Sequence, residues 1–229
     1  MKRPTKHIIS LINSIIFLFP LNGIKLEEIN SMNTSMYRFF FVLNFLCMNF
    51  DAAGEIIWFL DGLWSGKEFV MLAHIVPCLI MTFLGNIKMI FHFLNEKEVV
   101  KLIINFKELE DDKNIELANS NEQKSTENIY DREIKHLNTI IKLVKVLNSS
   151  TIIAFGLAPF ILMGAKYLKT KEFVPILPLY VKYHFFDPYN MIYYGLTYIH
   201  QFWSMCICMS SVTGVDMLFC TMCVFIKIH

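Results

Sequence analysis

Residues 191–226 read MIYYGLTYIHQFWSMCICMSSVTGVDMLFCTMCVFI, with Asp216 as the only Asp, Glu, Lys or Arg. About 20 helical residues cross a hydrocarbon core about 30 Å thick. This longer helix should therefore tilt or project into water. Three further apolar stretches precede it, at 36–60, 68–93 and 138–165. The sequence predicts an all-α polytopic membrane bundle with four transmembrane helices.

Composition supports a membrane protein. Hydrophobic residues make up 55% of the chain and charged residues 18%, below the roughly 25% usual for soluble domains. The net charge of +1 creates no general attraction for nucleic acid. We therefore expect membrane lipid, and no nucleic acid, among the partners.

The chain divides into an N-terminal segment, 1–35, and a membrane bundle, 36–226. The segment contains a short apolar helix at 8–19, although a cleaved signal peptide remains an alternative. A polar loop, 94–137, joins the second and third transmembrane helices, and an aromatic, proline-containing loop, 166–190, joins the third and fourth.

The polar loop has a helical pattern of its own. Val99, Leu102, Ile103 and Phe106 recur at helical spacing between charged residues. This pattern predicts amphipathic helices that extend the neighbouring transmembrane helices. The polar composition of 119–128 predicts a flexible link between them.

Lysine and arginine set the predicted orientation. They gather before the first transmembrane helix and in 94–137. Positive loops usually stay in the cytoplasm, so we expect a cytoplasmic N-terminus, an inner loop at 94–137 and an outer loop at 166–190. The sequon Asn33-Thr-Ser should then stay unglycosylated, whereas a cleaved signal peptide would expose it to modification.

Two acidic residues stand out within the first transmembrane helix. Asp51 and Glu55 are four residues apart and share one helix face. Charge at membrane depth usually faces the bundle interior, but an outer vestibule is an equally good interpretation. In the second transmembrane helix, Pro77 predicts a kink that frees the carbonyl group near Ala73.

Catalytic and metal-binding motifs are missing from the sequence. It contains no P-loop, GxGxxG, HExxH or GxSxG motif. All six cysteines lie in predicted transmembrane helices, which predicts no disulfide. Cys220 and Cys223 have CxxC spacing but lack a second ligand pair. We expect no enzyme activity, no catalytic residues, no cofactor and no metal.

One part of the chain carries a family resemblance. It runs Pro175-Ile-Leu-Pro178-Leu-Tyr, then Phe186-Asp-Pro-Tyr189, then Tyr193-Tyr194-Gly-Leu-Thr-Tyr198-Ile-His-Gln201. Together with the apolar segment ending at Phe19-Pro20 and the long charged inner loop, it resembles the insect odorant receptors, which are seven-helix subunits of ligand-gated channels. The resemblance covers the whole chain. The chain, however, accounts for only the first four of the seven helices expected in this family.

The resemblance implies a multi-pass protein of the sensory-neuron plasma membrane that binds a small volatile odorant in the outer half of its bundle. The full-length form would join a co-receptor subunit in an odorant-gated cation channel. Without helices five to seven, this portion should not conduct ions. The implied ligand-binding residues lie in the outer halves of three transmembrane helices: Met71, His74, Ile75, Ile153, Gly156, Phe160, Tyr194, Thr197, Tyr198 and Gln201.

Two alternatives remain open at this level. The related gustatory receptors place their best signature in the last helix, so a gustatory receptor fragment is possible. A self-contained four-span scaffold or transporter is the other. A tetraspanin would need a cysteine-rich outer loop, and 166–190 contains no cysteine.

Overall fold

The structure is a computed structural model that describes residues 34–67, 69–119 and 123–228, without the side chains of 71, 107, 110–131 and 228. The expected helix at 8–19 and the sequon at Asn33 lie outside the described residues. All regular structure in the described ranges is helical, as the sequence predicts.

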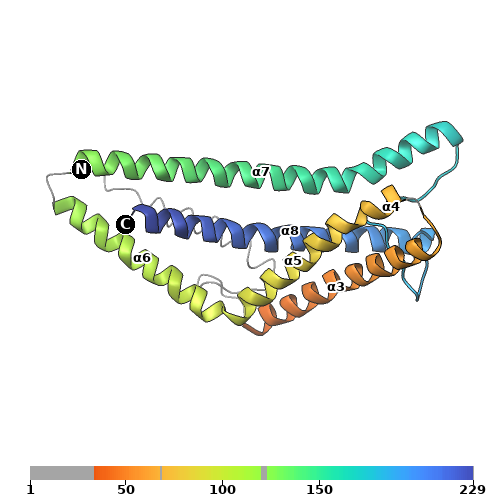
Figure 1. Ribbon diagram of the computed structural model, residues 1–229, viewed down its shortest axis with the longest axis horizontal. Helices are drawn as coiled ribbons and strands as arrows, with labels where there is room; N and C mark the ends of the chain where they lie inside the picture. Colours follow the sequence, from red (N-terminus) through yellow and green to blue (C-terminus); the bar gives the residue numbers. More distant parts are fainter. Residues whose placement is uncertain (1–33, 68, 120–122, 229) are drawn as a thin grey trace.

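The helices run in the order shown in Figure 1. Their bounds are α3 Thr34–Trp64, α4 Phe69–Ala73, α5 Ile75–Leu94, α6 Glu96–Asn119, α7 Gln123–Thr170 and α8 Met191–Ile228. Among the described residues, four segments are long and apolar enough to cross a membrane. They are Thr34–Trp64, Ile75–Leu94, Arg132–Thr170 and Met191–Lys227, so the number of candidate spans agrees with the prediction.

Helix α8 is the central helix of the bundle. It packs against α3, α5 and α7, and α3 also packs against α5. In the most apolar 18 residues of α8, half of the residues are buried inside the protein, whereas the corresponding share in α7 is 17%. Helix α7 is therefore peripheral. The fully buried side chains of Met48, Met89 and Ile207 join α3, α5 and α8 in one core.

Polar contacts accompany this packing at every main helix pair. In hydrocarbon, polar side chains find partners on neighbouring helices because water is absent. Lys88 Nζ lies 2.5 Å from Asp216 Oδ1, and Trp203 donates to Asn44 over 3.0 Å. The polar pairs are Asn49 with Asn86 between α3 and α5, and Asn44 with Trp203 between α3 and α8. Lys88 pairs with Asp216 between α5 and α8, and Asn148 pairs with Thr213 between α7 and α8.

The second predicted span is interrupted one turn before its proline, Pro77. A proline at 77 supplies no N–H for the carbonyl group of Ala73. The structure accordingly ends α4 at Ala73 and begins α5 at Ile75, with a turn at His74.

The predicted inner loop, 94–137, consists mainly of two helices. α6 and the first turns of α7 pack Phe106, Ile134 and Leu137 into the same core as Phe225 of α8. The prediction of a flexible link over 119–128 was wrong for its second part, because α7 already begins at Gln123. Gln, Lys and Glu are good helix formers, so a polar composition there suits an exposed helix as well as a linker.

The loop between α7 and α8, which keeps the name outer loop from its predicted side of the membrane, begins later than predicted, because α7 continues to Thr170. Lys171 then adopts a positive φ of 58°, the left-handed conformation that commonly follows a helix end. Figure 1 shows α7 bending toward this end, in the part of the helix that contains Pro159. The loop therefore spans 171–190 and turns back over the bundle.

Tyr183 fixes the outer loop to α3. Its buried hydroxyl group donates to Asp51 Oδ1 over 2.7 Å, and its ring stacks on Phe50 at 4.6 Å between centroids. The neighbouring Lys182 N–H donates to the carbonyl group of Gly54 over 3.1 Å. This close approach requires glycine, because a Cβ at Gly54 would lie 2.6 Å from the Tyr183 ring.

Helix α8 holds the same loop from the other side. Gln201 accepts from the Leu179 N–H over 3.1 Å and donates to its carbonyl group over 3.4 Å. Tyr194 donates to the carbonyl group of Ile176 over 3.0 Å. Burial raises the pKa of Tyr183 above its usual range and that of Tyr189 to about 12, so both phenols stay neutral near pH 7.

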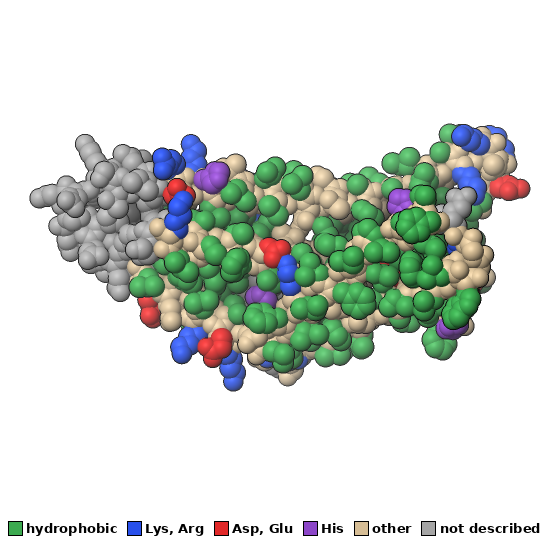
Figure 2. Space-filling model, in the orientation of Figure 1, with side chains coloured by type: hydrophobic (Ala, Val, Ile, Leu, Met, Phe, Trp, Pro, Cys, Tyr) green, Lys and Arg blue, Asp and Glu red, His purple; other side chains and the backbone are tan. Residues whose placement is uncertain are grey.

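The surface shows where the membrane would lie. In Figure 2, hydrophobic side chains cover most of the middle of this face, and Lys and Arg gather mainly toward its two ends. Exposed apolar side chains on every spanning helix, such as Phe39, Ile87, Ile161 and Ile199, fit contact with lipid chains.

The contact between Gly54 and Tyr183 predicts a stability difference between two glycine variants. Gly54→Ala should lower the free energy of unfolding by about 1–3 kcal/mol, because the loop must move away from the new methyl group. Gly164→Ala is the matched control, since nothing lies within 4 Å of a Cβ there. Unfolding in mixed detergent micelles would measure both. Equal stability of the two variants would show that the loop does not rest on α3.

Candidate ligand-binding sites

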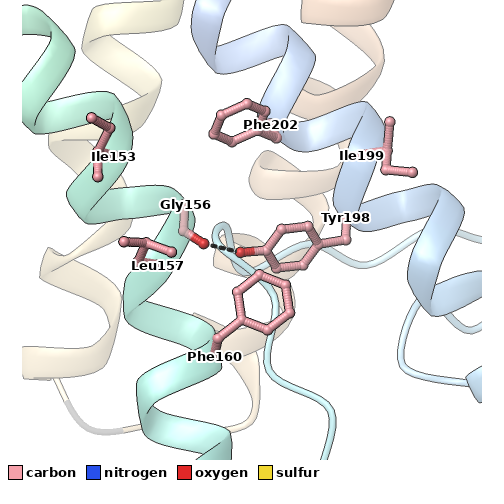
Figure 3. A pocket seen from close by; sticks show the side chains of 7 residues that line it. All are labelled: Ile153, Gly156, Leu157, Phe160, Tyr198, Ile199 and Phe202. Carbon is pink, nitrogen blue, oxygen red and sulfur yellow. Dashed lines mark hydrogen bonds between the residues drawn. The ribbon is translucent and has the colours of Figure 1, made fainter.

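A groove runs between α7 and α8 and has a volume of about 370 Å³. Figure 3 shows Tyr198 reaching from α8 toward α7, where its hydroxyl group donates to the carbonyl group of Gly156. Gly156 allows this close approach, because a Cβ there would lie 2.7 Å from the Phe202 ring. The lining residues are Ile153, Gly156, Leu157, Phe160, Tyr198, Ile199 and Phe202.

The groove unites four of the ten predicted ligand-binding residues: Ile153, Gly156, Phe160 and Tyr198. It is open on the membrane-facing side, where Ile153 and Ile199 are more than half exposed. Its one side-chain hydroxyl group is already bonded to Gly156. An occupant would therefore meet an almost wholly apolar surface, and lipid chains could reach the same surface.

A second, more enclosed space lies inside the bundle. This cavity has a volume of about 220 Å³ and is bounded by α3, α5, α7, α8 and the outer loop. Its apolar wall includes Met81, Phe155 and Met205, and Leu179 closes it from the loop side. The complete lining is Asp51, Glu55, Pro77, Cys78, Met81, Thr82, Thr151, Phe155, Leu179, Ser204, Met205, Cys208 and Met209.

Two polar groups of the cavity wall are satisfied within the protein. The Thr82 hydroxyl group donates to the Cys78 carbonyl group over 3.0 Å. The Cys208 thiol donates to the Met81 carbonyl group over 3.3 Å. Their hydrogens are thus committed to helix backbone, and the two carboxyl groups are the acidic side chains of the cavity wall.

Asp51 and Glu55 face the bundle interior rather than a vestibule, being 2% and 1% exposed. Asp51 Oδ1 accepts from Tyr183 and lies 3.1 Å from His200 Nδ1. Asp51 Oδ2 and Glu55 Oε2 are buried without a hydrogen-bond partner among the described residues. In the same part of the chain, no three His, Cys, Asp or Glu side chains form a group that could hold a metal ion.

The remaining predicted residues lie elsewhere. Gln201 and Tyr194 bind the outer loop, as described above. Ile75 packs with Trp58 and Leu72, and Thr197 is buried in α8. His74 is exposed at the break between α4 and α5, and the side chain of Met71 lies outside those described.

Sequence reasoning placed no cavity residue in the predicted binding set, although two signals were present. Asp51 and Glu55 were recognised as a charged pair on one helix face. In α8, the predicted face of Thr197 and Gln201 continues through Ser204 and Cys208 at the same helical spacing, and both of these line the cavity. Extending that face by two turns would have reached it.

Comparison with known proteins identifies the family. A family model described as "7tm Odorant receptor" matches residues 68–229. The curated odorant receptor 92a of Drosophila melanogaster is 26% identical over 188 residues, which cover 82% of this chain and 43% of that protein.

Solved structures show the same fold. The insect olfactory receptor OR5 from Machilis hrabei matches 97% of this chain with a TM-score of 0.64 and 14% identity. Its complex with eugenol matches the same share with a TM-score of 0.65. Both matches cover 55% of the receptor chain. The chain thus spans about half the length of the relatives it matches.

These findings set aside the gustatory and four-span alternatives. The family model matches well over half of the chain and includes α5, α7 and α8, the helices that form most of both candidate sites. This multi-pass membrane protein therefore belongs to the odorant receptor family of insects.

Proposed function

We propose that this receptor-family protein, which is not an enzyme, binds a small volatile odorant in the cavity between α3, α5, α7 and α8. The observation that carries the proposal is a cavity of about 220 Å³ that four helices and the outer loop line together. A related receptor has been solved with eugenol, a small odorant, which supports this class of ligand.

The chemistry of the cavity suits such a ligand. Small-molecule sites are mostly apolar, with a few polar groups that orient the ligand. Met81, Met205 and Met209 supply flexible, polarisable side chains that adapt to different shapes. Phe155 supplies an aromatic wall, and the carboxyl groups of Asp51 and Glu55 supply the polar contacts.

The cavity is a better candidate than the groove because four helices and the outer loop line it, so it is less open to lipid than the groove, although Phe155 in its wall is 42% exposed. A volatile ligand in the groove must compete with acyl chains for an apolar surface that is exposed to the membrane. In the cavity, burial on several sides removes more of the ligand surface from its surroundings. On this proposal, four of the predicted residues lie at the contact between α7 and α8 and do not touch the ligand: Ile153, Gly156, Phe160 and Tyr198.

For the whole receptor, we propose a subunit of an odorant-gated cation channel that assembles with a co-receptor subunit in the sensory-neuron plasma membrane. Family membership supports this assembly, and the cavity supplies its ligand-binding part. Ligand contacts with both Leu179 and α8 would link odorant binding to the packing of the central helix.

We expect a cavity-filling variant to prevent binding while a groove variant does not. Ser204→Leu adds carbon atoms to the cavity wall, so the eugenol-dependent rise in unfolding temperature of the chain in lipid nanodiscs should be lost. Ile199→Ala changes the groove alone and should keep that rise. The opposite result would place the ligand in the groove.

We also propose a cytoplasmic N-terminus, with the 171–190 loop outside and α6 inside. The distribution of lysine and arginine supports this orientation. Cysteines introduced by Glu172→Cys and Lys101→Cys test it, because both positions are exposed. A membrane-impermeant maleimide should label intact cells at position 172 and not at 101, and Asn33 should carry no glycan. Labelling only at 101 would reverse the topology.

A further inference from the structure

Asp51 and Glu55 each keep one buried carboxyl oxygen without a partner among the described residues, but only Asp51 has its other oxygen held by side-chain contacts that the structure describes, to Tyr183 and His200. The Glu55 side chain is 1% exposed, it lines the cavity, and Oε2 has no hydrogen-bond partner among the described residues. Ionising a buried carboxyl group without a partner is costly. A ligand that supplies the missing donor would therefore gain more here than at any apolar part of the wall.

The neighbouring side chains do not compensate Glu55. Asp51, one turn earlier, takes the Tyr183 hydroxyl group and lies beside His200. Thr82 and Cys208 donate to backbone carbonyl groups. A second acid four residues away on the same face adds negative potential, which further favours a cation at this point.

We propose that Glu55 binds the amino group of a small amine whose apolar part fills the cavity. The inference rests on the proposed function and specifies its ligand class. An ammonium group donates a charge-assisted hydrogen bond and also neutralises the buried charge. The remainder of the ligand packs against Met81, Phe155 and Met205.

A hydroxyl group is the closest competitor as a head group. An alcohol also donates one hydrogen bond, but burial without a partner favours the neutral form of the carboxyl group, so that bond joins two neutral groups, whereas an ammonium group stabilises the ionised form. Hydrogen bonds to charged partners are the stronger class. The geometry therefore predicts a preference for the amine over an alcohol of the same shape.

Three probes with a common aromatic body test this preference: 2-phenylethylamine, 2-phenylethanol and ethylbenzene. Each is titrated against the 229-residue chain in lipid nanodiscs, and the dissociation constant is taken from the shift in unfolding temperature. We expect the amine to bind most tightly. Glu55→Gln should weaken amine binding about tenfold or more and leave the other two probes unchanged.

Two further variants keep the test decisive. Glu55→Met, which removes the buried carboxyl group with little change in volume, should lose the amine preference in the same way, so a folding defect in one variant does not hide the result. Phe155→Ala should weaken all three probes, because it removes a wall that they share.

The outcomes separate this inference from the proposed function. If the alcohol and ethylbenzene bind but the amine binds no more tightly, the amine assignment fails while the cavity remains a ligand site. Equal losses for amine and alcohol in Glu55→Gln would also overturn it, by making Glu55 structural. If none of the probes binds the unaltered chain, both proposals fail.

Discussion

The buried carboxyl group of Asp51 joins three parts of this protein that are far apart in sequence. It lies on α3, accepts the hydroxyl group of Tyr183 from the outer loop, and contacts His200 on α8. In a low-dielectric interior, such a group is costly without partners; here Oδ1 has two, and Oδ2 has none among the described residues. These three residues, the Asp51 node, therefore hold the loop against α3. Gly54 leaves the space that this close approach needs.

Closure of the cavity follows from the same node. Tyr183 is held on α3 and Gln201 holds Leu179 on α8, so the loop is tied to the bundle from two sides. Leu179 then covers the space that α3, α5, α7 and α8 leave between them. A ligand that touches Leu179 would act directly on the loop, and through it on the Asp51 node.

Sequence reasoning succeeded where local chemistry determines the result. Four helices follow from long apolar stretches, and the break before Pro77 follows from one missing N–H. It could not place side chains whose surroundings depend on a distant partner. Gln201 and Tyr194 share a helix face with Tyr198. Because of the path that the loop takes, Gln201 and Tyr194 bind the loop, whereas Tyr198 lines the groove. The start of α7 was misjudged because the same polar residues suit a linker and a solvated helix.

The two spaces differ in what they can distinguish. In the groove, the Tyr198 hydroxyl group is spent on the Gly156 carbonyl group, so discrimination there depends on shape alone, in competition with lipid. In the cavity, an unpartnered carboxyl oxygen sits among apolar walls. Sites that leave a buried polar group to be matched reject unmatched ligands far more strongly than apolar sites reject a missing methylene group. If the cavity is the ligand site, as proposed, chemical selectivity would therefore reside there, with Glu55 as its main determinant.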